Sequence, residues 1–206
     1  MEKKYHILGR GGAGSLIGEF LFTEIKVQYD ITFVSPTEIN EGYEKTSHPL
    51  GKIPTLICPD GSRIFETLAI TNHITDRYRT LTPEPGTQMF DRYWQFLSLF
   101  ATSIYPAYHR QHHSRYYVKK EAYEDLKLNA RSEQSKIFDY INAELHPYIC
   151  GETVTAADFY LYMLLRWDVD KTALFNERSA LKKLWELIRE RPSVRKVIEN
   201  QPKKKT

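Results

Sequence analysis

The chain has 206 residues, of which 41% are hydrophobic and 27% are charged, so it holds enough apolar material for a buried core and is not expected to be disordered. Lys and Arg number 29 against 26 Asp and Glu, and the excess falls largely in the terminal Lys203–Lys205, which gives no basis for a nucleic-acid-binding surface. No apolar run reaches the ~18 residues that cross a membrane, and the N-terminus lacks the apolar region of a signal peptide, so we expect a cytoplasmic protein. Cys58 and Cys150 form no CxxC motif, and we expect neither a disulfide framework nor a metal site.

The first part of the chain alternates strand and helix patterns. The apolar run 5–8 predicts a strand that ends in the glycine-rich turn 9–14. Apolar residues at helical spacing follow Ser15, which is a plausible N-cap, and residues 29–34 predict a second strand. This order is that of a βαβ unit. The polar segment 37–47 is predicted to be irregular.

A hairpin and a helix complete this part. Residues 53–57 and 63–65, joined by a turn that contains glycine, predict a β-hairpin, and Thr67 opens a helix. The segment 80–87 is rich in Pro and Gly and is the best candidate for a domain boundary. We therefore predict an α/β domain over residues 1–79, a linker over 80–87, and an all-helical domain over 88–206.

Two helix starts in the second part can be read from capping residues. The run 155–167 is apolar on nearly all sides and predicts the buried central helix of a bundle. Thr155 and Asp158 are spaced as a reciprocal cap at its start, which is a structural role. Ser193, which follows Pro192, is predicted to cap a short last helix.

Two motifs in the first part carry a family resemblance. Residues 48–56, His-Pro-Leu-Gly-Lys-Ile-Pro-Thr-Leu, resemble the Asn-Pro-x-Gly-x-Val/Ile-Pro-x-Leu signature of the soluble glutathione transferases, with His48 in place of Asn. Residues 66–70, Glu-Thr-Leu-Ala-Ile, are similar to the Glu-Ser-x-Ala-Ile motif of the same family.

Further segments that resemble the same family occur in the second part of the chain. Residues 150–158 resemble the family's capping segment, residues 158–167 are most like the bacterial beta class, and residues 191–194 match the start of the family's final helix. The resemblance covers essentially the whole chain. It implies an α/β thioredoxin-like N-terminal domain followed by an all-α helical bundle.

The same motifs suggest how glutathione would be held. The resemblance implies a cis bond before Pro54 and pairing of the Ile53 main chain with the cysteinyl part of glutathione, as an extended peptide pairs with an unpaired edge. Glu66 and Thr67 lie where a strand ends and a helix begins. Free helix N–H groups there can bind a carboxylate and Glu66 can accept from an ammonium, which suits the γ-glutamyl end. Lys52 either pairs with the glycine carboxylate of glutathione or is solvated.

The residue that activates the thiol is the open question. The family's Tyr position falls on Leu8, the beta-class Cys position on Gly14 and the Ser position near Gly12. Ser15 is the only hydroxyl in the glycine-rich loop, so either it stabilises the thiolate or it only caps the first helix. Arg10 is a candidate for a positive charge beside the thiolate.

The predicted function is conjugation of the glutathione thiolate to apolar electrophiles, a detoxification activity, with glutathione as co-substrate and without a metal. Tyr105 and Tyr108 are expected to line the site for the electrophile. The resemblance also implies a homodimer, without a nucleic-acid or membrane partner. The alternative is a non-catalytic glutathione-transferase-like binding or scaffold protein. A disulfide oxidoreductase needs a reactive Cys in the first turn, where the sequence has none.

Overall fold

The computed structural model describes residues 4–40 and 47–202, so the basic tail and part of the segment predicted to be irregular lie outside the described residues. Two compact units make up the chain: Met1–Thr80 together with Arg189–Thr206, and Leu81–Ile188. The last segment therefore groups with the first unit, although the sequence places it after the helical part. None of the helices in the described part is long and apolar enough to cross a membrane.

The first unit contains a four-stranded sheet in the order β2-β1-β3-β4. Its strands are β1 (Tyr5–Gly9), β2 (Tyr29–Phe33), β3 (Thr55–Ile57) and β4 (Arg63–Phe65). β2 is parallel to β1, whereas β3 is antiparallel to both β1 and β4. These pairings confirm the predicted βαβ unit and hairpin.

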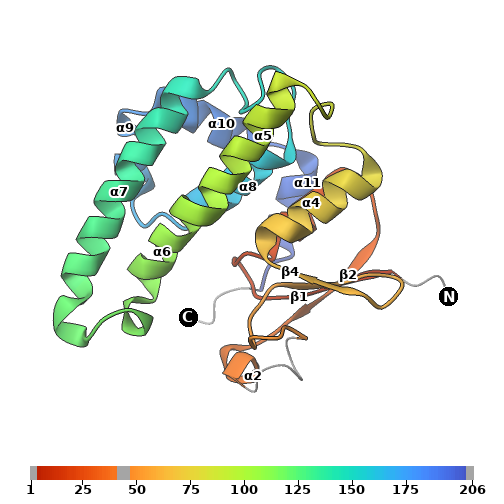
Figure 1. Ribbon diagram of the computed structural model, residues 1–206, viewed down its shortest axis with the longest axis horizontal. Helices are drawn as coiled ribbons and strands as arrows, with labels where there is room; N and C mark the ends of the chain where they lie inside the picture. The colour runs from red at the N-terminus through yellow and green to blue at the C-terminus, as the bar shows by residue number, and fades with distance from the viewer. Residues whose placement is uncertain (1–3, 41–46, 203–206) are drawn as a thin grey trace. The chain divides into compact units, whose positions relative to one another are not determined.

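Among the described residues, the helices of this unit are α1 (Leu16–Glu24), α2 (Pro36–Asn40), α4 (Thr67–Tyr78) and α11 (Pro192–Glu199). α1 packs against α4 and α11, and Figure 1 shows α2 and α4 on opposite sides of the sheet. The short α2 lies in the segment predicted to be irregular, which corrects that prediction for the described residues. α11 belongs to this unit because its Val194 and Val197 are buried as it packs against α1.

The prediction that Ser193 caps the last helix is wrong. The N-cap position of α11 is Arg191, and it makes no side-chain cap hydrogen bond. The Ser193 hydroxyl and the Arg191 guanidinium instead both donate to the carboxylate of Glu24 on α1. A charged acceptor on a neighbouring helix forms the stronger hydrogen bond, so the hydroxyl joins two helices rather than capping one.

The second unit is helical, as predicted. It consists of α5 (Gln88–Leu99), a π-helical turn (Phe100–Ile104), α6 (Tyr105–His112), two short 3-10 turns (Ser114–Tyr116 and Lys120–Ala122), α7 (Tyr123–Glu144), α8 (Ala156–Leu165), α9 (Lys171–Asn176) and α10 (Ser179–Arg189). Every residue of α8 is buried, which confirms the predicted central helix. α5 and the π-helical turn pack against it, and the ring of Tyr162 on α8 lies 4.6 Å from that of Trp185 on α10.

The predicted cap of α8 is present. Asp158 is completely buried, and its carboxylate accepts hydrogen bonds from Thr155 N at 2.7 Å, Thr155 Oγ1 at 2.9 Å and Ile149 N at 2.8 Å. Thr155 and Asp158 form a reciprocal capping box. Burial raises the pKa of Asp158 to about 6, despite these hydrogen bonds. Its three contacts are all within the unit, so Asp158 has a structural role.

Candidate functional site

Three segments that are far apart in sequence meet at one end of the sheet. Leu8 of β1 pairs with Thr55 of β3, so the end of β1 lies beside Pro54, which precedes β3. Thr55 also pairs with Phe65 of β4, which places Glu66 beside Pro54 on the other side. The loop after β1, the residues before β3 and the start of α4 therefore share one edge.

Ile53 and Pro54 form the centre of this edge. Their peptide bond is cis, as the resemblance implies, and Pro54 is buried while Ile53 is half-buried. β3 begins only at Thr55, so Ile53 stands outside the sheet hydrogen bonds. Within residues 4–40 and 47–202 no protein group hydrogen-bonds to the Ile53 main chain. An N–H and a C=O are thus left for an extended ligand.

Glu66 and Thr67 stand at the junction of β4 and α4. Glu66 is exposed and has a positive φ of 69°, which is unusual for a residue with a side chain. Thr67 is buried and is the first residue of α4. The first N–H groups of a helix have no partner within it and favour an anion. The exposed Glu66 carboxylate beside them is an acceptor for a cation, so the junction offers both halves of a site for a zwitterion.

His48 fixes the loop that leads to this edge, a role that the sequence did not suggest. The side chain is 2% exposed, and its Nδ1 accepts a hydrogen bond from Leu50 N at 3.0 Å. The imidazole also packs on the ring of Phe65, with 4.7 Å between centroids. Burial lowers the pKa of His48, which favours the neutral ring that this acceptor role requires. An Asn side chain accepts in the same way in such turns, which explains how His replaces it here. Lys52, four residues on, is exposed.

Ser15 is buried, and its hydroxyl is used within the loop. Oγ accepts from Arg10 N at 3.3 Å and donates to Arg10 O at 3.1 Å, and it makes no cap hydrogen bond to α1. Ser15 thus occupies the N-cap position of α1, as expected, but its hydroxyl does not form a capping hydrogen bond, because it bonds to the nearby main chain of Arg10 instead. This contact also explains Gly9, where a Cβ atom would lie 2.3 Å from the Cβ of Ser15.

The glycine-rich loop presents main-chain donors. In the described part of the chain, the N–H groups of Gly11, Gly14 and Ser15 have no hydrogen-bond partner. Gly14, Ser15 and Pro54 all border one packing void that is too small to hold a water molecule, so the three residues lie close together. Donors just before a helix N-terminus stabilise an anion such as a thiolate. A further polar group close by is the buried Thr55 Oγ1, which has no partner among the described residues; a threonine in a strand gives no sequence signal for this.

Gln201 and Pro202, near the end of the chain, contact the same glycine-rich loop. Gln201 Oε1 accepts from Gly12 N at 3.0 Å, and Gln201 Nε2 donates to Glu19 Oε2 at 2.8 Å. The ring of Pro202 lies against Gly11, where an added Cβ would be 3.0 Å from Pro202 Cδ. Nothing in the sequence links these residues, because the first contact spans 189 positions.

Tyr105 and Tyr108, the expected substrate-lining residues, belong to the helical unit. Tyr105 is half-buried and packs edge-on against Trp167, with 4.9 Å between centroids. Tyr108 is 1% exposed, and its hydroxyl donates to Asp168 Oδ2 at 3.2 Å. Burial raises the pKa of Tyr108 well above its usual value. In this unit Tyr105 is the more accessible of the two rings.

Comparison with known proteins agrees with this geometry. The glutathione S-transferase N-terminal domain family matches residues 14–76, and the C-terminal domain family matches residues 102–192. The chain belongs to the glutathione S-transferase family. A GST-like protein of Escherichia coli K12, YncG, is 28% identical over 167 residues, which is 78% of this chain and 80% of that protein. Glutathione S-transferase GstA of Escherichia coli O157:H7 is 27% identical over 58% of this chain and 59% of its own.

Solved structures show the same fold. A glutathione transferase homologue from Sulfitobacter, with bound glutathione, matches with a TM-score of 0.85 and 18% identity, over 96% of this chain and 98% of that one. A bacterial beta class glutathione S-transferase from Sphingomonas chungbukensis matches with a TM-score of 0.79 and 23% identity, over 94% and 97% of the two chains. The α/β thioredoxin-like unit with a helical unit is thus the glutathione transferase fold.

Proposed function

We propose that this glutathione S-transferase family member binds glutathione at the edge formed by Ile53, Pro54, Glu66 and Thr67. The γ-glutamyl ammonium pairs with the Glu66 carboxylate, and its α-carboxylate accepts from the N-terminus of α4 at Thr67. The cysteinyl main chain pairs with Ile53, and Lys52 attracts the glycine carboxylate. The observation that carries the proposal is the unpaired Ile53 main chain, directly beside an exposed carboxylate and a helix N-terminus.

The chemistry proposed is conjugation of the bound thiolate to an apolar electrophile. A thiol with a pKa near 8.5 is mostly protonated at pH 7, and lowering that pKa by ~2 units requires about 2.7 kcal/mol. The loop N–H groups of Gly14 and Ser15, together with the start of α1, are the donors that can supply it. The Ser15 hydroxyl contributes by turning its proton from Arg10 O to the sulfur. Catalysis then rests on positioning and on electrostatic stabilisation of the thiolate.

The remaining parts of the proposal concern the electrophile and the setting. Tyr105 and Tyr108 belong to the side of the helical unit that receives the apolar substrate, with Tyr105 the more accessible ring. A cytoplasmic homodimer with a detoxification role completes the proposal.

Calorimetry with reduced glutathione tests the binding site. Wild type is compared with Glu66→Ala and with a matched control, Glu121→Ala, whose exposed side chain lies in the other unit. Loss of a charge-assisted contact predicts at least about tenfold weaker binding for Glu66→Ala and no change for the control. Equal affinity of the three proteins would overturn the assignment of the charged end.

A rate measurement with 1-chloro-2,4-dinitrobenzene tests the chemistry. If the Ser15 hydroxyl donates to the thiolate, Ser15→Ala lowers kcat by about tenfold or more and raises the pKa of the bound thiol, while the Kd for glutathione changes little. The thiolate absorbance as a function of pH reports that pKa directly. An unchanged thiol pKa in Ser15→Ala assigns the stabilisation to the main-chain donors alone.

A second candidate is a non-catalytic binding or scaffold protein of the same fold. The observation in its favour is that Arg10 already engages the Ser15 hydroxyl as both donor and acceptor. The chain is also 29% identical, over 128 residues, to elongation factor 1-gamma from Equus caballus, of which the match covers 27%. Glutathione binding without any rate above the solution reaction would select this candidate.

A further inference from the structure

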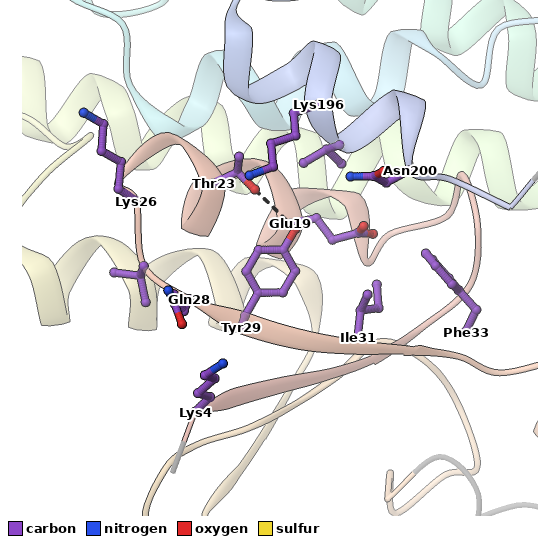
Figure 2. Close-up of a pocket in the computed structure, with 12 residues that line it drawn as sticks. Lys4, Glu19, Thr23, Lys26, Gln28, Tyr29, Ile31, Phe33, Lys196 and Asn200 are labelled. Atoms are coloured by element: carbon purple, nitrogen blue, oxygen red, sulfur yellow. Dashed lines mark hydrogen bonds between the residues drawn. The ribbon is translucent and has the colours of Figure 1, made fainter. Parts of the chain in front are cut away.

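A cavity of about 540 Å³ lies in the first unit between α1, β2 and α11, and the proposed glutathione site does not use it. β2 is an edge strand of the sheet. Tyr29, Ile31 and Phe33 alternate along β2 and are half-buried, whereas the residues between them are exposed. Figure 2 shows these three side chains rising from the strand into the cavity, below α1 and α11. They give the cavity one apolar wall, of a size suited to a small molecule.

Glu19 of α1 is the buried charge in this cavity. The side chain is 3% exposed and lines the cavity, and its Oε2 accepts from Gln201 Nε2 at 2.8 Å. Glu19 Oε1 is buried and has no hydrogen-bond partner in the part of the chain that the structure describes. Leaving a buried carboxylate oxygen without a donor is costly, so a ligand that brings a donor gains that free energy on binding.

The other charged groups of the cavity are all positive. The cavity is lined by Lys4 just before β1, Lys26 just after α1 and Lys196 of α11. Figure 2 shows Lys196 above Tyr29, with Lys26 and Lys4 at the left of the view. Within residues 4–40 and 47–202 none of the three forms an ion pair with a carboxylate. The cavity thus combines one buried acceptor with a positive surround.

This pattern selects among ligand classes. A simple anion is attracted by the lysines but leaves Glu19 Oε1 without a donor. A simple cation pairs with Glu19 but meets the three lysines. A molecule that carries an ammonium and a carboxylate satisfies both, and an apolar side chain on the same molecule fits the wall formed by Tyr29, Ile31 and Phe33.

We propose that this cavity is a second ligand site, which binds a free amino acid with an aromatic side chain through its ammonium at Glu19 and its carboxylate at the lysines. The residues that line this site do not include Ile53, Pro54, Glu66 or Thr67 of the proposed glutathione site. Glu19 nevertheless reaches the glycine-rich loop through Gln201, which bonds to Gly12 N. A ligand bound at Glu19 would therefore be connected to the glycine-rich loop through the side chain of Gln201.

Three related probes test the charge pattern: L-phenylalanine, N-acetyl-phenylalanine, which lacks the ammonium, and phenethylamine, which lacks the carboxylate. We expect L-phenylalanine to bind at millimolar concentration in calorimetry and to shift amide resonances of α1, β2 and α11. Each truncated probe is expected to bind at least about tenfold more weakly, because each loses one charge-assisted contact. Equal binding of the acetylated probe, or no binding of L-phenylalanine, overturns the proposal.

Two variants on the same helix locate the site. Glu19→Gln keeps the shape and an acceptor for Gln201 but removes the charge, and it should weaken L-phenylalanine binding by about tenfold or more. Glu24→Gln is the matched control, because Glu24 does not line the cavity, and it should leave L-phenylalanine binding unchanged. The same samples are titrated with glutathione, so a failure here is separable from a failure of the proposed function. Unchanged binding to Glu19→Gln refutes this site.

Discussion

Replacing Glu19 by Gln should stabilise the protein, and the gain should grow with pH. Burial raises the pKa of Glu19 to about 7, from the ordinary 4.5, although the hydrogen bond from Gln201 acts in the opposite direction. The unfolded side chain therefore loses its proton at a lower pH than the folded one. Between these values the folded state binds more protons, so stability falls as pH rises through this range. A neutral amide at this position removes that loss.

The size of the effect follows from the two pKa values. One pKa unit corresponds to about 1.4 kcal/mol, so a displacement from 4.5 to about 7 costs the folded wild type about 3 kcal/mol at pH 8. At pH 5, where the folded carboxyl is protonated and the unfolded one only partly ionised, the cost is about 1 kcal/mol. The free-energy difference between Glu19→Gln and wild type should therefore increase by about 2 kcal/mol between these pH values.

Urea unfolding of both proteins at pH 5, 6, 7 and 8 measures this difference, and other titrating groups cancel in the comparison. Glu24→Gln on the same helix is a control with the opposite sign. Burial raises the pKa of Glu24, but hydrogen bonds from Arg191 and Ser193 outweigh it, and the pKa is lowered. This variant should lose stability by an amount that is constant over the same pH range, because the stabilisation from Glu24 is lost only below its ordinary pKa. Parallel pH profiles of wild type and Glu19→Gln would refute the assignment of a buried, costly charge.

Three more variants test separate contacts. Asp158→Ala removes the acceptor of two buried main-chain N–H groups and should lower the free energy of unfolding by about 3 kcal/mol in a denaturant titration. Gln201→Ala frees Gly12 N and should lower kcat with 1-chloro-2,4-dinitrobenzene while the Kd for glutathione stays within about twofold, since the loop and not the peptide edge is loosened; a change in Kd alone would contradict this. Lys52→Ala should weaken glutathione binding at low salt, with a difference from wild type that disappears as salt is added; a difference that persists at high salt would indicate a direct hydrogen bond instead.

Sequence patterns were sufficient wherever the controlling contacts are local. The strand and helix periodicities located the βαβ unit, the hairpin and the buried α8, because side-chain spacing along one element decides which face is apolar. The cap of α8 was also predictable, since Thr155 and Asp158 are three residues apart and meet as soon as the helix forms. The cis bond before Pro54 was predicted in a different way, from the resemblance of residues 48–56 to a family motif.

Hydroxyl groups showed the limit of this reasoning. Ser15 and Ser193 both stand where a serine usually caps a helix, yet one bonds to the Arg10 main chain and the other to the Glu24 carboxylate. A hydroxyl takes the best acceptor within reach, and for Ser193 that acceptor comes from a helix 169 residues away. Sequence spacing indicates which hydroxyl groups could cap a helix, but it does not show which other acceptors lie within their reach in the folded protein.

The order and type of the elements were determined by the sequence alone, because each depends on neighbours a few residues apart. Only the tertiary structure decided that α11 joins the first unit, that Gln201 holds Gly12, and that Glu19 is buried beside a cavity. These features arise when distant surfaces pack together and exclude water, and a one-dimensional pattern does not record which surfaces those are.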